Sequence, residues 1–235
     1  MAATLVRIDR RFRGPAESGN GGYTSGLIAG FVDAEAVEVT LRLPPPLERP
    51  LAAEREPGRA RLLDGEDVVA EAVAAALADR PPAPVGWREA AAATARFPGF
   101  AEHAFPECFV CGPARAEGDG LRIFPGPVAG RAGLVAAPWV ARDVEPALVW
   151  AAIDCPGAFG AGVSGRGQTV LGRMTATVRR LPEEGERCVA VGWPLGEDGR
   201  KLHAGTALYG EDGEALAWAR QTWIVPRSAG EGLPP

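Results

Sequence analysis

The chain has 235 residues, of which 46% are hydrophobic and 23% are charged, and its formal net charge is −5. This apolar fraction is ordinary for a packed core and excludes disorder as the main state. No apolar run approaches the ~18–20 residues that a membrane-spanning helix needs. The acidic balance gives no support for nucleic-acid binding, which leaves a basic footprint. We therefore expect a globular protein with neither nucleic acid nor membrane as partner.

The first residues and the cysteines indicate a cellular location. The chain starts with an alternating, strand-like pattern and lacks the basic and apolar regions of an export signal. Its four cysteines, Cys108, Cys111, Cys155 and Cys188, are too few to stabilise a chain of this length by disulfide bonds. We expect a cytoplasmic protein with reduced thiols.

The first third of the chain predicts a strand, a small buried helix, a second strand and a hairpin, in that order. The prolines Pro44, Pro45 and Pro46 end the second strand, because proline cannot donate to a strand ladder. The pair Asp64-Gly65 suits a tight turn within the hairpin. The expected elements cover residues 4–13, 23–32, 37–43, 59–63 and 68–74.

Residues 79–120 interrupt this rhythm with six prolines and predict a connection that holds a short helix at residues 87–96. Beyond it the pattern of strands, helix and terminal hairpin returns, and Asp212-Gly213 forms the hairpin turn. The expected strands are residues 121–124, 133–137, 171–179, 187–193, 203–209 and 215–225, and the expected helix is residues 146–154.

The two halves share the order strand, helix, strand and terminal hairpin, and an internal duplication accounts for it most economically. The segment 39–42 before Pro44 also resembles the segment 176–179 before Pro182. The alternative is that any two small α+β segments look alike at this level. The predicted division is an N-terminal half (1–78), a Pro-rich connection (79–120), a C-terminal half (121–227) and a flexible tail (228–235).

Three patches resemble acyl-CoA thioesterases of the double hotdog type, including the type II enzymes. They are Asn20-Gly21-Gly22-Tyr23 with the following Ser25–Ala29, Trp150–Asp154, and Asp212–Gln221. A fourth patch, Cys108–Pro113 leading to Gly118–Leu121, is similar to the segment that leads into many single-hotdog thioesterases. In type II enzymes a glutamine follows the turn glycine by eight residues, and Gln221 stands in that position after Gly213. The resemblance implies an α+β tandem hotdog with two antiparallel sheets, each wrapping a central helix.

The chain also departs from the family pattern. The family acid follows a Gly-Gly pair by about seven residues, but here Ala29 lies at that distance from Gly22, and Ala147 precedes Asp154 by the same distance. The glycines of one half and the acid of the other therefore imply one site per chain. A family threonine on the next strand falls near Leu171-Gly172, where only Thr169 and Thr175 are neighbours.

Thioester hydrolysis needs an activated water and a donor for the developing oxyanion. Asp154, in an apolar segment, is the candidate water activator, although an aspartate before Cys155-Pro156-Gly157 also fits an ordinary turn. Gln221 is the candidate assistant, with an outward polar residue on an edge strand as its alternative. The candidate substrate-binding residues are Asn20, Gly21, Gly22 and Tyr23 at a helix start, and Trp150, Ile153 and Phe159 along the acyl chain.

The pair Cys108-x-x-Cys111 with His103 raises the question of zinc, which needs four ligands in a closed structural site. A second close pair is missing, because Cys155, Cys188 and His203 are distant in sequence. We therefore predict no metal and no cofactor, with the two cysteines as reduced structural thiols or a redox-labile pair. Gly-x-Ser-x-Gly and phosphate-loop motifs are absent from the sequence.

The sequence thus favours hydrolysis of an acyl-CoA or related acyl thioester, with water activated by the helix-borne Asp154. The alternative is a hotdog protein that binds an acyl or aromatic ligand without catalysis. A third reading is a purely structural duplicated hotdog with a role in an oligomer. Homodimerisation is compatible with the sequence without being required by it.

Overall fold

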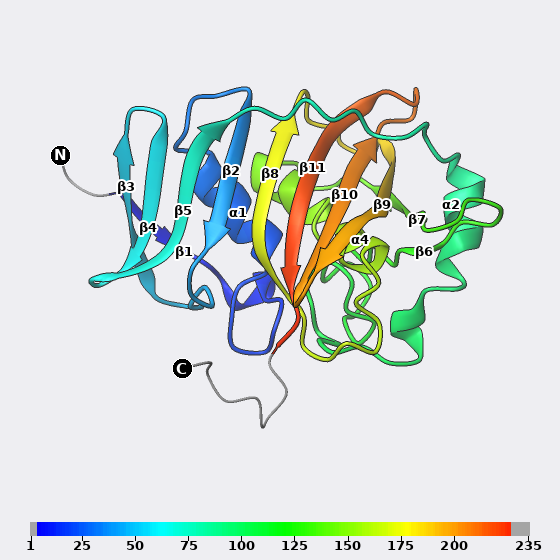
Figure 1. Ribbon diagram of the computed structural model, residues 1–235, viewed down its shortest axis with the longest axis horizontal. Helices are drawn as coiled ribbons and strands as arrows, with labels where there is room; N and C mark the ends of the chain where they lie inside the picture. The colour runs from blue at the N-terminus through cyan, green and yellow to red at the C-terminus, as the bar shows by residue number, and fades with distance from the viewer. Residues whose placement is uncertain (1–3, 227–235) are drawn as a thin grey trace.

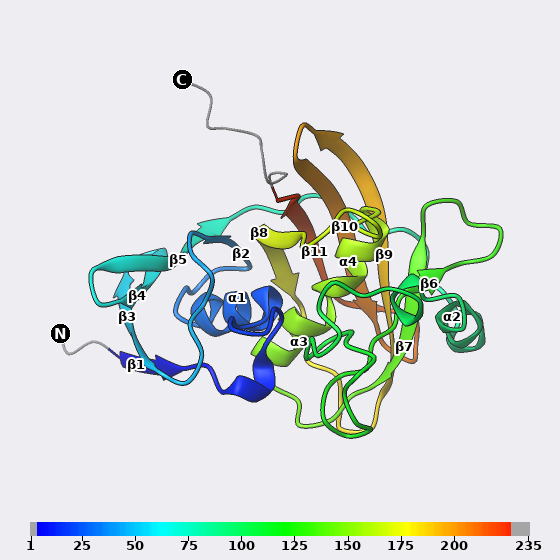
Figure 2. The same cartoon turned by 90° about the horizontal axis from the view of Figure 1, so that it is seen from below.

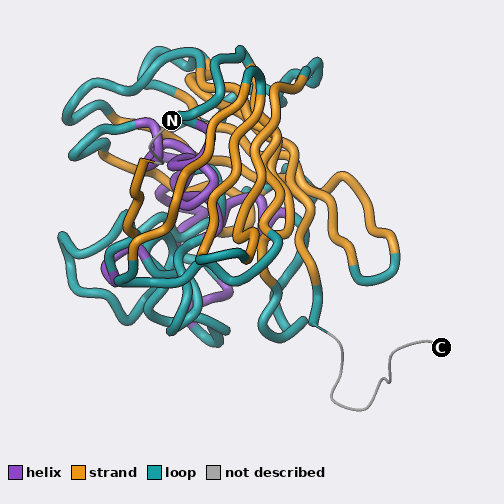
Figure 3. The backbone as a smooth tube through the Cα atoms, turned by 90° about the vertical axis from the view of Figure 1, so that its left-hand side faces the viewer, coloured by secondary structure: helices purple, strands orange, loops and turns teal. Residues whose placement is uncertain are grey.

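A computed structural model describes residues 4–226, in which eleven strands form one antiparallel sheet (Figures 1 and 3). The strand order is β1-β3-β4-β5-β2-β8-β11-β10-β9-β7-β6. The strands are β1 (Thr4–Arg7), β2 (Ala36–Leu41), β3 (Pro50–Glu56), β4 (Arg59–Asp64), β5 (Asp67–Ala75), β6 (Gly126–Pro127), β7 (Val135–Val140), β8 (Val170–Val178), β9 (Arg187–Asp198), β10 (Lys201–Tyr209) and β11 (Ala215–Ile224).

The two halves meet at the pair β2 and β8, which run antiparallel with Val37 opposite Ala176 and Val39 opposite Met174. This pairing corrects the sequence prediction of two separate sheets, because backbone hydrogen bonds continue across the junction. The reason is physical: each half leaves an unpaired strand edge, and pairing the two edges satisfies the N–H and C=O groups of both.

The strand order is the same in the two halves. The first half has the order β1-β3-β4-β5-β2 and the second has β7-β9-β10-β11-β8, read from its outer edge inward. In each half the helical segment comes between the first two of these strands in sequence: α1 (Gly21–Ala29) in one, α3 (Pro146–Ala152) and α4 (Cys155–Gly160) in the other. The two halves therefore share one strand order and one position for the helical segment.

Most predicted elements are confirmed within a few residues, and the exceptions have local causes. The strand expected at residues 4–13 ends at Arg7, because Asp9 accepts a hydrogen bond from the N–H of Arg11 and starts the 3-10 turn η1 (Arg10–Phe12). Residues 121–124 form no strand: the N–H groups of Leu121 and Ile123 donate to carbonyl groups of the nearby 109–110 segment. The sequence analysis also missed β3.

The sheet curves around α1, α3 and α4, which lie on its concave face (Figure 2). Helix α2 (Trp87–Thr94) instead packs against the opposite face near β7 and β9. The segment predicted as a connection also holds η2 (Pro98–Phe100) and contributes to the core, where Phe97, Phe109 and Val110 are buried. The stacked rings of Phe12 and Tyr23, with centroids 3.9 Å apart, meet the edge of Phe109.

The described part of the chain contains no helix long and apolar enough to cross a bilayer. The predicted tail at 228–235 lies outside the described residues.

Helices α1 and α3 approach each other so closely that only glycine fits at two positions of α1. A Cβ atom on Gly22 would lie 2.7 Å from the carbonyl oxygen of Trp150, and one on Gly26 would lie 2.6 Å from the Cα atom of Ala147. Real Cβ contacts of this length essentially do not occur, so the two glycines set the distance between the helices.

We expect Gly26→Ala to destabilise the fold by about 1–3 kcal/mol, because the added methyl group would overpack the α1–α3 contact. Alanine favours helix more than glycine does, so helix propensity alone predicts the opposite sign. Thermal and denaturant unfolding measure the difference.

The matched control is Gly30→Ala at the C-terminal cap of α1. Its φ is −60°, and the nearest atom to its Cβ would be the carbonyl oxygen of Leu27 at 3.5 Å. This variant should unfold like the wild type or at slightly higher denaturant. Equal stability of the two variants would contradict a tight α1–α3 contact.

Candidate functional site

The start of α1 and the end of α3 meet at a pair of side chains, Asn20 and Asp154. Asn20 caps α1 by accepting a hydrogen bond from the N–H of Tyr23 at 2.9 Å. Its amide nitrogen donates to Oδ2 of Asp154 at 2.7 Å, and the backbone N–H of Gly22 also donates to this carboxylate. The helix N-terminus and the acid thus come from opposite halves of the chain.

Asp154 is 1% exposed, and its second carboxylate oxygen, Oδ1, has no hydrogen-bond partner among the described residues. Burial raises the pKa of Asp154 to about 7, and the nearby charge of Cys108 adds to the rise. The hydrogen bonds from Gly22 and Asn20 act in the opposite direction, because they stabilise the ionised form. Oδ1 is therefore the oxygen of this carboxylate to which no described residue donates.

A cavity of about 590 Å³ opens beside Asp154, between the 14–21 loop, α4 and the segments before β8. Its walls are mainly apolar or backbone, and they include Phe105, Phe159, Val163 and Leu171. Thr169 also lies on the wall, where its hydroxyl group donates to the carbonyl group of Arg166. Both its position and its volume fit a small-molecule site.

The other predicted site residues, apart from Gln221, fall into three groups. Asn20, Gly21 and Phe159 line the cavity together with Asp154. Gly22 lies just behind the wall, against the Cβ atom of Asp154. The side chains of Tyr23, Trp150 and Ile153 are buried in the core and are not among the cavity residues.

Gln221 projects from β11 toward the core, as the alternation along this strand predicted, and is 2% exposed. Its amide nitrogen donates to the carbonyl oxygen of Ile153 at 2.7 Å and to that of Asp154 at 3.2 Å. Its Oε1 accepts a hydrogen bond from Nε1 of Trp223 at 2.8 Å. These bonds connect the α3–α4 junction to the sheet. Both the nitrogen and the oxygen of the Gln221 amide take part in them, behind the cavity wall.

Two cysteines of one loop and a third that is distant in sequence meet at the same wall. Cys108, Cys111 and Cys155 are buried, and their sulfur atoms all lie within 4.8 Å of one another. Hydrogen bonds from the Cys111 and Cys155 thiols hold the pKa of Cys108 well below its ordinary value. The sequence analysis missed Cys155 as a partner, because 44 residues separate it from Cys111 and nothing in the sequence reveals that α4 starts under the loop.

No family model matches the chain, and no curated protein does. Solved structures are similar over nearly the whole chain. A protein from Thermobifida fusca described as a thioesterase II has a TM-score of 0.64 at 13% identity, covering 95% of this chain and 92% of that one. The acyl-CoA thioesterase II TesB2 of Mycobacterium marinum has a TM-score of 0.55 at 14% identity, covering 91% and 93%.

A protein of unknown function with a hotdog fold from Alicyclobacillus acidocaldarius gives a TM-score of 0.58 at 11% identity, covering 97% of this chain and 94% of that one. At such identities the similarity shows the fold alone. The chain therefore shares the hotdog fold of thioesterase II proteins.

We expect Gln221→Met to destabilise the protein by about 1–3 kcal/mol, because it leaves the carbonyl oxygen of Ile153 and the indole N–H of Trp223 without partners. Denaturant unfolding measures the loss. The matched control is Arg220→Met on the opposite face of β11, where the exposed Arg220 only pairs with Asp79 on the surface. Equal losses in the two variants would contradict the assigned role of the amide.

Proposed function

We propose that this chain, which shares its fold with thioesterase II proteins, hydrolyses acyl thioesters at the cavity beside Asp154. One observation carries the proposal: a buried carboxylate with a free oxygen lies on the cavity wall, at the N-terminus of a helix from the other half. Enzymes use such a carboxylate to orient and deprotonate water.

The reaction begins with a water molecule that donates a hydrogen bond to Oδ1 of Asp154. The water oxygen attacks the thioester carbonyl carbon, and Asp154 takes the proton. The C–S bond of the tetrahedral intermediate then breaks, the leaving thiolate takes the proton back from Asp154, and the products are a carboxylic acid and a thiol. Asn20 keeps Oδ2 occupied, so that Oδ1 is the oxygen that takes the water.

The oxyanion of the intermediate needs donors that are already in place. Gly21 is the first residue of α1 and lies on the cavity wall. Within residues 4–226 no hydrogen bond to another residue engages its N–H group. The dipole of α1 favours negative charge at this end, which supports Gly21 as the oxyanion donor.

The substrate is an acyl-CoA or related acyl thioester, because the cavity offers an apolar wall for an acyl chain. Phe159 and Val163 form this wall, so the acyl chain runs along α4 rather than along the buried Trp150 and Ile153. Gln221 positions Asp154 through the α3–α4 junction, in place of the direct catalytic role predicted from sequence. A cytoplasmic location and a homodimer stay predictions from the sequence.

We expect Asp154→Asn to lower kcat for thioester hydrolysis by on the order of 100-fold or more, because the amide cannot accept the proton from water. The measurement is thiol release from a panel of short, long and aromatic acyl-CoAs. Circular dichroism verifies that the isosteric variant folds.

The control is Glu66→Gln in the β4–β5 turn, which removes one exposed carboxylate that does not line the cavity and should retain wild-type kcat. Unchanged turnover in Asp154→Asn would refute the role of this acid. Binding of an acyl-CoA without any hydrolysis by the wild type would refute the proposed reaction.

We expect Asn20→Ser and Asn20→Ala to separate the two roles of Asn20. Serine still caps α1 but is too short to donate to Asp154, so kcat should fall in both variants with KM changed less. Only Asn20→Ala should lose stability, by about 0.5–2 kcal/mol, because it also removes the cap. Wild-type kcat in Asn20→Ser would show that the bond to Asp154 has no part in catalysis.

A further inference from the structure

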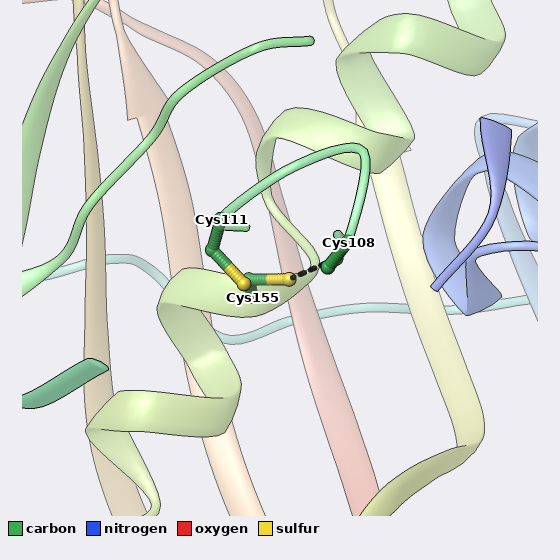
Figure 4. A group of neighbouring side chains, drawn as sticks. All are labelled: Cys108, Cys111 and Cys155. Atoms are coloured by element: carbon green, nitrogen blue, oxygen red, sulfur yellow. Dashed lines mark hydrogen bonds between the residues drawn. The ribbon is translucent and has the colours of Figure 1, made fainter. Parts of the chain in front are cut away.

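The cluster of Cys108, Cys111 and Cys155 is a feature that the proposed reaction does not use. Figure 4 shows the first two on the loop before residue 113 and the third at the start of α4, with the three side chains pointing toward one another. Their sulfur atoms lie within 4.8 Å of one another, and those of Cys108 and Cys155 are 3.8 Å apart.

This spacing fits a metal ion. A zinc–sulfur bond of about 2.3 Å in a tetrahedral site places two sulfur ligands about 3.8 Å apart. A disulfide instead needs a sulfur–sulfur distance of about 2.0 Å. All four cysteines of the chain are free in the structure.

The 108–112 loop is a tight turn that brings its two cysteines together. The N–H of Gly112 donates to the carbonyl oxygen of Cys108 at 2.9 Å. A Cβ atom on Gly112 would lie 2.5 Å from the Cys108 nitrogen, so the tight turn after the second cysteine requires glycine. This turn holds the sulfur atoms of Cys108 and Cys111 close to each other.

His103 supports the cluster without entering it. Its Nδ1 accepts a hydrogen bond from the N–H of Phe105 at 3.0 Å, so in the neutral ring Nε2 carries the proton. That Nε2 lies 3.3 Å from the sulfur of Cys111 and donates to it. A nitrogen that holds a proton cannot bind a metal, which leaves three sulfur ligands.

We propose that Cys108, Cys111 and Cys155 bind one zinc ion through three thiolates. Soft sulfur donors select zinc over magnesium, calcium or manganese. All three cysteines line the cavity, so the fourth position of the ion is open to a water molecule or another small ligand. The ion would also join the 108–111 loop to the start of α4, next to Asp154. The sequence shows only two close cysteines, and the fold brings a third to them.

The first test is the metal content of the full-length chain, purified without chelator or a metal-affinity step and measured by mass spectrometry. We expect about one zinc per chain in the wild type, and at least a tenfold loss in Cys108→Ser and Cys155→Ser. Cys188→Ser is the matched control, because Cys188 is a buried cysteine on β9 outside the cluster, and it should keep its zinc. His103→Ala should keep it too.

Cobalt gives a second readout that does not need the cluster variants to fold. Co²⁺ added to the metal-free wild type and to Cys188→Ser should produce the intense sulfur-to-cobalt charge-transfer absorption of a thiolate site. Zinc should then displace the cobalt, and zinc binding should raise Tm, because a ligand that binds only the folded state stabilises it.

Two results would overturn the proposal: a wild type without stoichiometric zinc that gives no thiolate absorption with Co²⁺, or zinc that all cysteine variants retain. Loss of zinc in His103→Ala would refute the three-thiolate ligand set. These readouts do not depend on thioester hydrolysis, so the zinc site and the proposed reaction can fail separately.

Discussion

The close contact between α1 and α3 is the constraint on which the site depends. Gly22 and Gly26 let the backbone of α1 approach that of α3. As a result the N–H of Gly22 reaches the carboxylate of Asp154, and the Asn20 cap of α1 becomes its second donor. Any larger side chain at Gly22 would separate the two halves at the point where the acid and the helix N-terminus meet. Gly22 therefore serves both the packing of α1 against α3 and the hydrogen bonding of the Asp154 carboxylate.

The continuous sheet holds α1 and α3 against each other. Because β2 pairs with β8, the concave faces of the two halves form one surface, and α1, α3 and α4 pack on it as a single layer. Gln221 connects that surface to the α3–α4 junction through the backbone carbonyls of Ile153 and Asp154. The acid is thus fixed from one side by the sheet and from the other by α1. Its oxygen Oδ1 has no hydrogen-bond partner among the described residues.

The loop before residue 113 closes the remaining side of the cavity. Sequence patterns give this segment little regular structure, but its interior is held by the Phe109 ring and by backbone bonds around Cys108. A metal ion at the three sulfur atoms would fasten the loop to α4, where Asp154 precedes Cys155. The proposed zinc site and the proposed reaction then share one wall of the cavity, although each rests on its own observations.

The sequence by itself determined the local elements, because apolar periodicity, Asp-Gly turns and proline breaks act over short distances, and it indicated Asp154 as the candidate acid. The order of strands and helix, the inward face of Gln221 and the helix start at Asn20 all follow from such signals. Only the tertiary structure decided that the halves form one sheet, that Gln221 bonds backbone rather than bordering the cavity, and that Cys155 joins Cys108 and Cys111. These depend on contacts between residues far apart in the chain, and local periodicity carries no information about such distances.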